Sequence, residues 1–207
     1  MHRHFFPMKK LLLSTAYLPA IEYISLISKA SQILIEKEEN YIKQSYRNRC
    51  YILSSHGRQL LSVPVLLGSI HKTPVREIRI DYSKRWQQVH LRALTSAYSS
   101  SPYFQFYFES IEKIISSNFD LLIDLNSELL ALILTILKIN VNLRYTDRFE
   151  PSMSAEYDYR YALSPKIQSH FLVKKYLQVF DNSNGFVQNL SVLDLIFNVG
   201  PEAINFF

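Results

Sequence analysis

The chain has 207 residues, of which 48% are hydrophobic and 20% are charged, and its net charge is +5. The length fits one domain, and the composition excludes an intrinsically disordered chain. The positive charge does not indicate nucleic-acid binding, because Arg3, Lys9 and Lys10 supply much of it and no run of cations or basic helix face follows them.

The single cysteine, Cys50, excludes an intrachain disulfide and a metal site built on paired cysteines. This usage fits a reducing compartment, so we expect a cytoplasmic protein. Cys50 opens an apolar stretch over residues 50–53, which favours a buried side chain over a nucleophile.

Residues 1–8 are expected to form a disordered extension, and residues 9–207 a single domain. The longest strongly aliphatic run covers residues 129–137. It is far shorter than the roughly 20 residues that a membrane-spanning helix needs, so no membrane span is predicted.

The first third of the chain predicts a Rossmann-like strand–helix–strand unit. A strand over residues 10–14 is followed by a loop over 15–19, a helix over 20–29 and a second strand over 32–36. Two strands joined by a crossover helix imply a parallel pair. An added hairpin is expected next, with strands over residues 51–54 and 60–65 around a turn at 55–58.

The remainder predicts a mainly helical half, so the expected fold class is α/β. The expected elements are a strand over 75–80, a helix from an N-cap at Ser83 to residue 98, a helix that begins after Pro102, a buried helix over 121–138, a strand over 141–145, an irregular segment over 146–169, a strand over 171–179 and a turn over 182–185. Ser191 is predicted to cap a last short helix, with Asp194 at the capping-box position; for Asp194 a capping role is favoured over catalysis.

The densest group of hydrogen-bond donors lies in residues 41–50, directly after an acidic run over residues 36–39. It predicts a site for an anion, and the alternative is a solvated, salt-bridged loop. Because parallel strands bring their carboxyl ends to one edge of the sheet, the arginines are expected to reach the loop and helix start at residues 15–20. The candidate anion-binding residues are Thr15, Tyr17, Lys43, Tyr46, Arg47, Asn48 and Arg49.

Two residues are candidates for a catalytic base. His90 lies on the apolar face of its predicted helix, where a satisfied core histidine is the alternative, and Glu22 is the second candidate. Asp158, Arg160 and Lys166 lie in the irregular segment and are expected either to form a lid over a substrate or to belong to an ordinary surface loop. No spacing of metal ligands is present, so no metal and no other cofactor is predicted.

Several segments, taken in order, resemble the WbqC-like family. They are Ser14–Pro19 with Glu22 and Tyr23, then Tyr41–Cys50, Trp86 with His90 and Tyr98, Ser101–Phe104 and Asn189–Asn198. Many relatives carry Gln-Pro-Tyr-(x)2-Pro-(x)2-Gly-Tyr at the first loop, where this chain has Ser14 and Thr15 for Gln-Pro and Glu22 for Gly. The Trp-(x)3-His pattern of Trp86 and His90 also recurs in the family.

The resemblance implies a role in making or decorating bacterial surface polysaccharides such as O-antigen. We expect a transferase that uses an activated sugar or acyl donor, such as a sugar nucleotide or an acyl carrier, and whose anionic part the cationic residues bind. The alternative is a non-catalytic binding or scaffold protein that recruits glycan enzymes.

Overall fold

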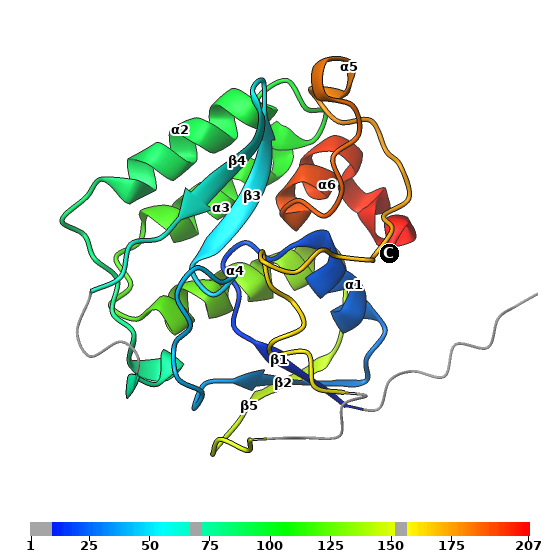
Figure 1. Ribbon diagram of the computed structural model, residues 1–207. Coiled ribbons are helices and arrows are strands. Elements are labelled where there is room, and N and C mark those ends of the chain that lie inside the picture. The colour runs from blue at the N-terminus through cyan, green and yellow to red at the C-terminus, as the bar shows by residue number, and fades with distance from the viewer. Residues whose placement is uncertain (1–9, 67–71, 152–156) are drawn as a thin grey trace, which may run out of the picture.

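The computed structural model describes residues 10–66, 72–151 and 157–207, so the extension expected over residues 1–8 lies outside the described residues. In chain order the elements are β1 (Leu11–Ser14), α1 (Ile21–Ser28), β2 (Gln32–Glu36), β3 (Arg49–Ser54), β4 (Gly57–Ser62), the 3-10 helix η2 (Val75–Glu77), α2 (Trp86–Tyr98), α3 (Phe104–Ser116), α4 (Leu122–Ile136), β5 (Asn142–Tyr145), α5 (Asp181–Asn184), α6 (Val192–Val199) and the 3-10 helix η3 (Gly200–Phe206). Figure 1 shows their arrangement.

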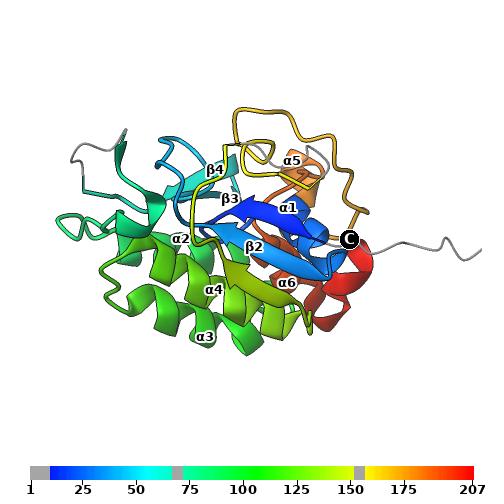
Figure 2. The ribbon, with the colours of Figure 1, turned by 90° about the horizontal axis from the view of Figure 1, so that it is seen from below.

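The predicted parallel strand pair is confirmed. Leu11 of β1 lies opposite Ile33 of β2, and β5 adds a third parallel strand on the other side of β2. Leu11, Leu13, Ile33 and Ile35 are buried on one face of this sheet. Seen from below, the strands lie in front of the helices, so the helices cover that one face (Figure 2). The α/β fold class is therefore confirmed.

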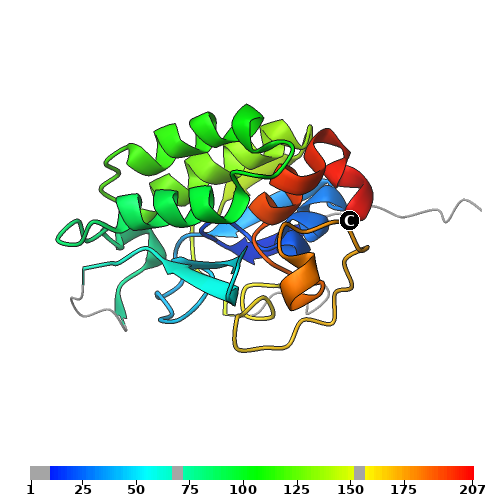
Figure 3. The same cartoon turned by 90° about the horizontal axis from the view of Figure 1, so that it is seen from above.

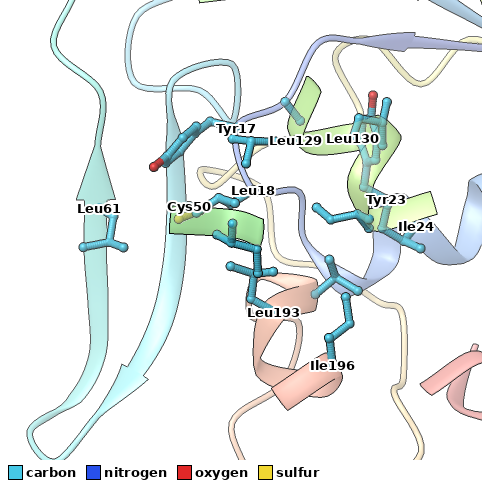
Figure 4. Packing of buried hydrophobic residues seen from close by; sticks show 14 of the residues in the cluster. Tyr17, Leu18, Tyr23, Ile24, Cys50, Leu61, Leu129, Leu130, Leu193 and Ile196 are labelled. Carbon is cyan, nitrogen blue, oxygen red and sulfur yellow. The ribbon is translucent and has the colours of Figure 1, made fainter. Parts of the chain in front are cut away.

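The predicted hairpin is also confirmed, but its second strand begins and ends three residues earlier than expected, at Gly57–Ser62. Residues Ser54 and Gly57 face each other at its tip, where Gly57 takes a positive φ of 94° that suits glycine. Cys50 of β3 is buried as predicted, and burial raises the pKa of its thiol. It belongs to the same buried cluster as Leu18 of the loop after β1 and Leu193 of α6 (Figure 4).

Two predicted strands are wrong. Residues 75–77 form η2, because the amides of Val75 and Arg76 donate to the carbonyls of Glu39 and Lys37. Arg79 and Ile80 make only isolated bridges, to Leu121 and Val65. Residues 171–179 form no strand within the described chain. There a side-chain amide takes the place of a strand partner, since the N–H of Val173 donates to Oε1 of Gln188.

The predicted N-cap at Ser83 is also wrong. The N–H of Ser83 donates to Oδ1 of Asp81 in a local turn, and α2 begins three residues later at Trp86. Ser191, in contrast, is confirmed as the N-cap of α6, because its Oγ accepts from the N–H of Leu193 at 3.3 Å.

Asp194 does not complete the capping box, because the N–H of Ser191 donates instead to the carbonyl of Tyr51 at 2.7 Å. The Asp194 carboxylate is fully buried and accepts hydrogen bonds from the Tyr176 hydroxyl at 2.5 Å and from Gln178 Nε2 at 2.9 Å. Burial raises its pKa, and these hydrogen bonds oppose that effect. Asp194 thus ties the segment before α5 to α6.

Candidate functional site

Arg47 reaches the carboxyl end of β1. Its Nη2 donates to Oγ of Ser14 at 2.7 Å, and its Nε donates to Oε1 of Glu39 at 2.9 Å. Both Arg47 and Glu39 are buried. The arginine therefore reaches the last residue of β1, directly before the first loop. The Glu39 carboxylate, from the acidic run that precedes it in the sequence, compensates its charge.

Arg160 comes to the same point from the second half of the chain. Its Nη1 donates to Oε2 of Glu36 at 2.9 Å, its Nη2 donates to Oδ2 of Asp158 at 2.6 Å, and its carbonyl accepts from Oγ of Ser14 at 3.0 Å. The side chain is 0% exposed. The hydroxyl of Ser14 thus joins the two arginines.

The segment that carries Asp158 and Arg160 lies alongside β1. The N–H of Leu12 donates to the carbonyl of Tyr157 at 2.8 Å, and the N–H of Tyr159 donates to the carbonyl of Leu12 at 2.9 Å. Buried charges are tolerated only when they are paired and hydrogen-bonded. Arg160 therefore holds its segment against the edge of the sheet through Glu36 and Ser14, and Arg47 binds the same Ser14 hydroxyl.

Three adjoining hollows lie between the loop that follows β2 and the segment over residues 159–172. The inner hollow measures about 10 Å³ and is lined by Ser14, Thr15, Ala16, Tyr23, Tyr46, Arg47, Tyr159, Arg160 and Leu163. The middle hollow measures about 50 Å³ and is lined by Ile42, Lys43, Gln44, Ser45, Arg47, Arg160, Tyr161, Leu163, Ser164 and Lys166. The outer hollow measures about 390 Å³ and is lined by Tyr46, Arg58, Pro165, Lys166, Ile167, Gln168, Ser169, Phe171, Leu172, Gln188 and Asn189.

Shared residues connect the three hollows. Arg47 and Arg160 line both the inner and the middle hollow, Lys166 lines the middle and the outer one, and Tyr46 lines the inner and the outer one. Of these three hollows, the outer one alone has the size of a small-molecule site. A wider hollow of about 560 Å³, on the sheet face that the helices leave open, includes none of the predicted site residues.

The electrostatic character of the outer hollow is cationic. Among the residues that the structure describes, no aspartate or glutamate lines the middle or the outer hollow. Within the same described residues, none of the ion pairs involves Lys43, Arg58 or Lys166. The guanidinium of Arg58 lies over the ring of Tyr51, at 4.0 Å from its centroid.

Glu22 adjoins the outer hollow through Asn189. The amide Nδ2 of Asn189 donates to Oε2 of Glu22 at 3.0 Å, and its Oδ1 accepts from the N–H of Glu22 at 3.0 Å. Burial raises the pKa of Tyr46, and the charge of Glu22 adds to that rise, whereas Arg58 lowers the pKa through its charge and a hydrogen bond. Tyr46, Arg58 and Glu22 therefore interact electrostatically.

The start of α1 is occupied by the chain itself. The N–H of Ile21 donates to the carbonyl of Leu190 at 2.9 Å, and Asn189 caps the next amide. Asn189 has a φ of 49°, in the left-handed region that asparagine tolerates better than most residues. The site expected at this helix start is thus filled by residues 189–190, while Thr15 lines the inner hollow.

Tyr17 and His90 lie in the core, outside the three hollows. The Tyr17 hydroxyl is 2.8 Å from Nδ1 of His90, and the indole of Trp86 packs edge-on against the imidazole at 5.2 Å between centroids. His90 is 3% exposed. Burial lowers its pKa to about 4, and a hydrogen bond with the backbone of Ser62 acts in the opposite direction.

Asn48 and Arg49 likewise line none of the three hollows. Nδ2 of Asn48 donates to the carbonyl of Val63 at 2.8 Å, which anchors the end of the hairpin. Arg49 opens β3 opposite Ser62. The predicted anion-binding residues therefore divide into two groups, and Thr15, Lys43, Tyr46 and Arg47 form the group that lines the hollows.

Sequence reasoning missed several residues of this region. They are Ser14, Glu36, Glu39, Arg58 and Asn189. The proximity of the acidic run at residues 36–39 to the cationic run was the signal that could have paired Glu39 with Arg47. No local pattern could have connected Arg160 with Glu36, because 124 positions separate them.

Fold and site together define an α/β protein with paired, buried arginines at the carboxyl edge of a small parallel sheet and a cationic hollow beside them. The chain belongs to the WbqC-like protein family, whose sequence model matches residues 15–169. It is also similar to the uncharacterized protein Rv1507c of Mycobacterium tuberculosis, with 28% identity over 95% of this chain and 96% of that protein. No solved structure matches the chain.

Two further findings apply to the described residues. No helix among them is both long and apolar enough to span a membrane. No group of three or more His, Cys, Asp or Glu side chains within them could hold a metal ion.

Proposed function

We propose that this protein is a transferase of bacterial surface-polysaccharide biosynthesis, and that the outer hollow binds the anionic part of an activated sugar or acyl donor. Membership of the WbqC-like family supports the biosynthetic context. The main support for the site is that Arg58 and Lys166 line a hollow of about 390 Å³. No aspartate or glutamate among the described residues lines this hollow. Guanidinium and ammonium groups are the side chains that bind phosphates and carboxylates.

In this proposal Glu22 is the base that removes a proton from the acceptor hydroxyl. Asn189, which lines the hollow, fixes the Glu22 carboxylate by a hydrogen bond of 3.0 Å. A base must be held in place to act efficiently, and a side-chain amide provides this without adding a competing charge. His90 is less suited to the role, because its imidazole is buried against Tyr17 outside the three hollows.

Arg47 and Arg160 act in this proposal through structure rather than by contact with the donor. Both guanidinium groups are paired with buried carboxylates. They fix the loop that carries Lys43 and Tyr46 and the segment that carries Lys166, so the cationic side chains face the same hollows.

Thermal-shift measurements with UDP-sugars and acetyl-CoA test the binding step. A donor present at about 100 times its Kd stabilises the folded state by about 2.7 kcal/mol. We expect Arg58→Ala and Lys166→Ala to reduce this shift, whereas the matched control Lys113→Ala on α3 retains it. A panel of donors without any shift would contradict the proposal.

Glu22→Gln separates catalysis from binding. The amide retains an oxygen that can accept the hydrogen bond from Asn189 but cannot serve as a base, so the thermal shift should persist while transfer to the acceptor stops. If wild-type protein binds a donor and never transfers it, the alternative of a non-catalytic binding or scaffold protein is supported instead.

A further inference from the structure

The rim of the middle and outer hollows carries exposed apolar side chains. Ile42 is 38% exposed, Tyr161 45%, Ile167 54% and Leu172 82%. Each of the four lines one of these two hollows, and the hollows share Lys166, so side chains from segments far apart in the sequence gather around adjoining hollows. Contiguous exposed apolar side chains mark interaction sites in folded proteins.

Lysines are interspersed with these apolar side chains. Lys43 and Lys166 are exposed on the same two hollows. The stretch over residues 161–177 contains Lys166, Lys174 and Lys175 and has no aspartate or glutamate. We call the six residues Ile42, Lys43, Tyr161, Lys166, Ile167 and Leu172 the rim patch.

The rim patch occupies an outer side of the molecule. In Figures 2 and 3 the segment that precedes α5 runs along the periphery, on the side opposite α3. Residues 161–177 contain no helix or strand, so the segment follows an irregular path across the surface. The segment that carries most of the rim patch therefore lies on a side of the molecule that α3 does not cover.

We propose that the rim patch binds the surface of a lipid bilayer that contains anionic phospholipids. The aliphatic side chains of Ile167 and Leu172 would enter the boundary of the acyl chains, and Lys43 and Lys166 would pair with head-group phosphates. Apolar insertion combined with attraction to anionic lipids is the way in which peripheral proteins bind membranes. The irregular backbone stays in the hydrated head-group layer, where water satisfies its polar groups.

Charge argues against a second copy of the chain as the partner. A two-fold interface would place each lysine of the patch against the same basic surface, and like charges at an interface oppose association. An anionic bilayer satisfies both the apolar and the cationic members of the rim patch. This inference does not depend on the identity of the donor or on catalysis. Lys166 also lines the proposed donor site, so binding to vesicles is measured without a donor.

Vesicle flotation without any donor tests the inference. We expect the full-length protein to float with vesicles of phosphatidylcholine and phosphatidylglycerol at a ratio of about 7:3, and not with phosphatidylcholine alone, because the lysines require negative lipid charge. Raising the salt concentration from about 0.1 M to about 0.5 M should weaken binding, because salt screens the attraction.

Variants identify the residues involved. Ile167→Ser with Leu172→Ser should weaken binding to anionic vesicles by at least about tenfold, because each change removes a large apolar side chain from the contact. Lys43→Gln with Lys166→Gln should weaken binding and reduce its dependence on salt. Phe106→Ser is the matched control, because Phe106 is 75% exposed on α3, away from the rim patch, and should leave flotation unchanged.

The inference is overturned if the wild-type protein remains in the unbound fraction. That result would favour an acidic protein as the partner of the rim patch. The inference is equally overturned if Phe106→Ser weakens flotation as much as the change at Ile167 and Leu172. The substituted side chains are exposed, so unfolding midpoints should match the wild type and confirm that the variants are folded. The thermal shift with soluble donors is a separate measurement. A protein that does not float can still bind a donor, and a protein that shows no thermal shift can still bind vesicles.

Discussion

Asn189 holds Glu22 at two points, because its side chain accepts a hydrogen bond from the Glu22 amide and donates one to the Glu22 carboxylate, each at 3.0 Å. One asparagine thereby caps the first turn of α1 and fixes the candidate base. The two residues are 167 positions apart in the chain. Their contact joins the beginning and the end of the sequence beside the outer hollow.

Replacement of Asn189 should separate its two contributions to stability. Asn189→Gly removes both hydrogen bonds and retains the left-handed backbone, and we expect a loss of about 1 kcal/mol in the free energy of unfolding. Asn189→Ala removes the same bonds and adds backbone strain at a φ of 49°, so its loss should be larger. Urea unfolding measures both, and equal losses would contradict a strained backbone at this position.

The pair formed by Arg47 and Glu39 should be strongly coupled. Removing one partner leaves a buried charge without compensation, so Arg47→Met and Glu39→Gln should each lower the free energy of unfolding by about 3–5 kcal/mol. The double variant should lose less than the sum of the two single variants. A double-mutant cycle in urea measures the coupling, and strictly additive losses would mean that the two charges act independently.

His90 should make stability depend on pH on the acidic side of neutrality. Its pKa is lowered from 6.5 to about 4 in the folded state, so the unfolded chain binds the proton more tightly. The contribution of the neutral His90 to the free energy of unfolding is therefore fully present above about pH 6.5. It is lost as the pH decreases towards 4, and the loss amounts to about 3 kcal/mol at most.

His90→Gln provides the comparison for this pH dependence. Glutamine retains a side chain that can hydrogen-bond with the Tyr17 hydroxyl but does not titrate. We expect the difference in free energy of unfolding between wild type and variant to shrink as the pH is lowered from about 7 to about 4.5 in urea titrations. A difference that stays constant over this range would refute the buried, neutral imidazole.

Short-range patterns predicted the elements whose partners are near in sequence. The spacing of isoleucines and the turn residues gave α1, β2 and the hairpin, because local propensity and burial favour the same structure there. The predicted strands over residues 75–80 and 171–179 failed for a common reason. Their apolar patterns reflect burial of side chains such as Val75 and Tyr176. The backbone of the first segment makes a 3-10 turn and isolated bridges, and residues 171–179 pair with no strand among the described residues.

The candidate site was predicted only in part for a similar reason. The cationic stretch identified Lys43, Tyr46 and Arg47, and its position after β2 placed Arg47 next to the first loop. The sequence could not indicate which side chains of this stretch would line the hollows. Asn48 and Arg49 do not line them, because Asn48 binds the end of the hairpin and Arg49 already belongs to β3. Pairing of Arg160 with Glu36 depends on tertiary structure, which no spacing in the sequence encodes.

The order of the strands has a consequence for synthesis of the chain on the ribosome. β2 receives its second neighbour only when Asn142–Tyr145 has been made, and β1 gains its outer contact only with Tyr157 and Tyr159. α6, which packs on α1 and β3, comes later still. A nascent chain of about 140 residues would therefore expose its apolar strands to solvent, so we expect it to rely on chaperones until translation is nearly finished.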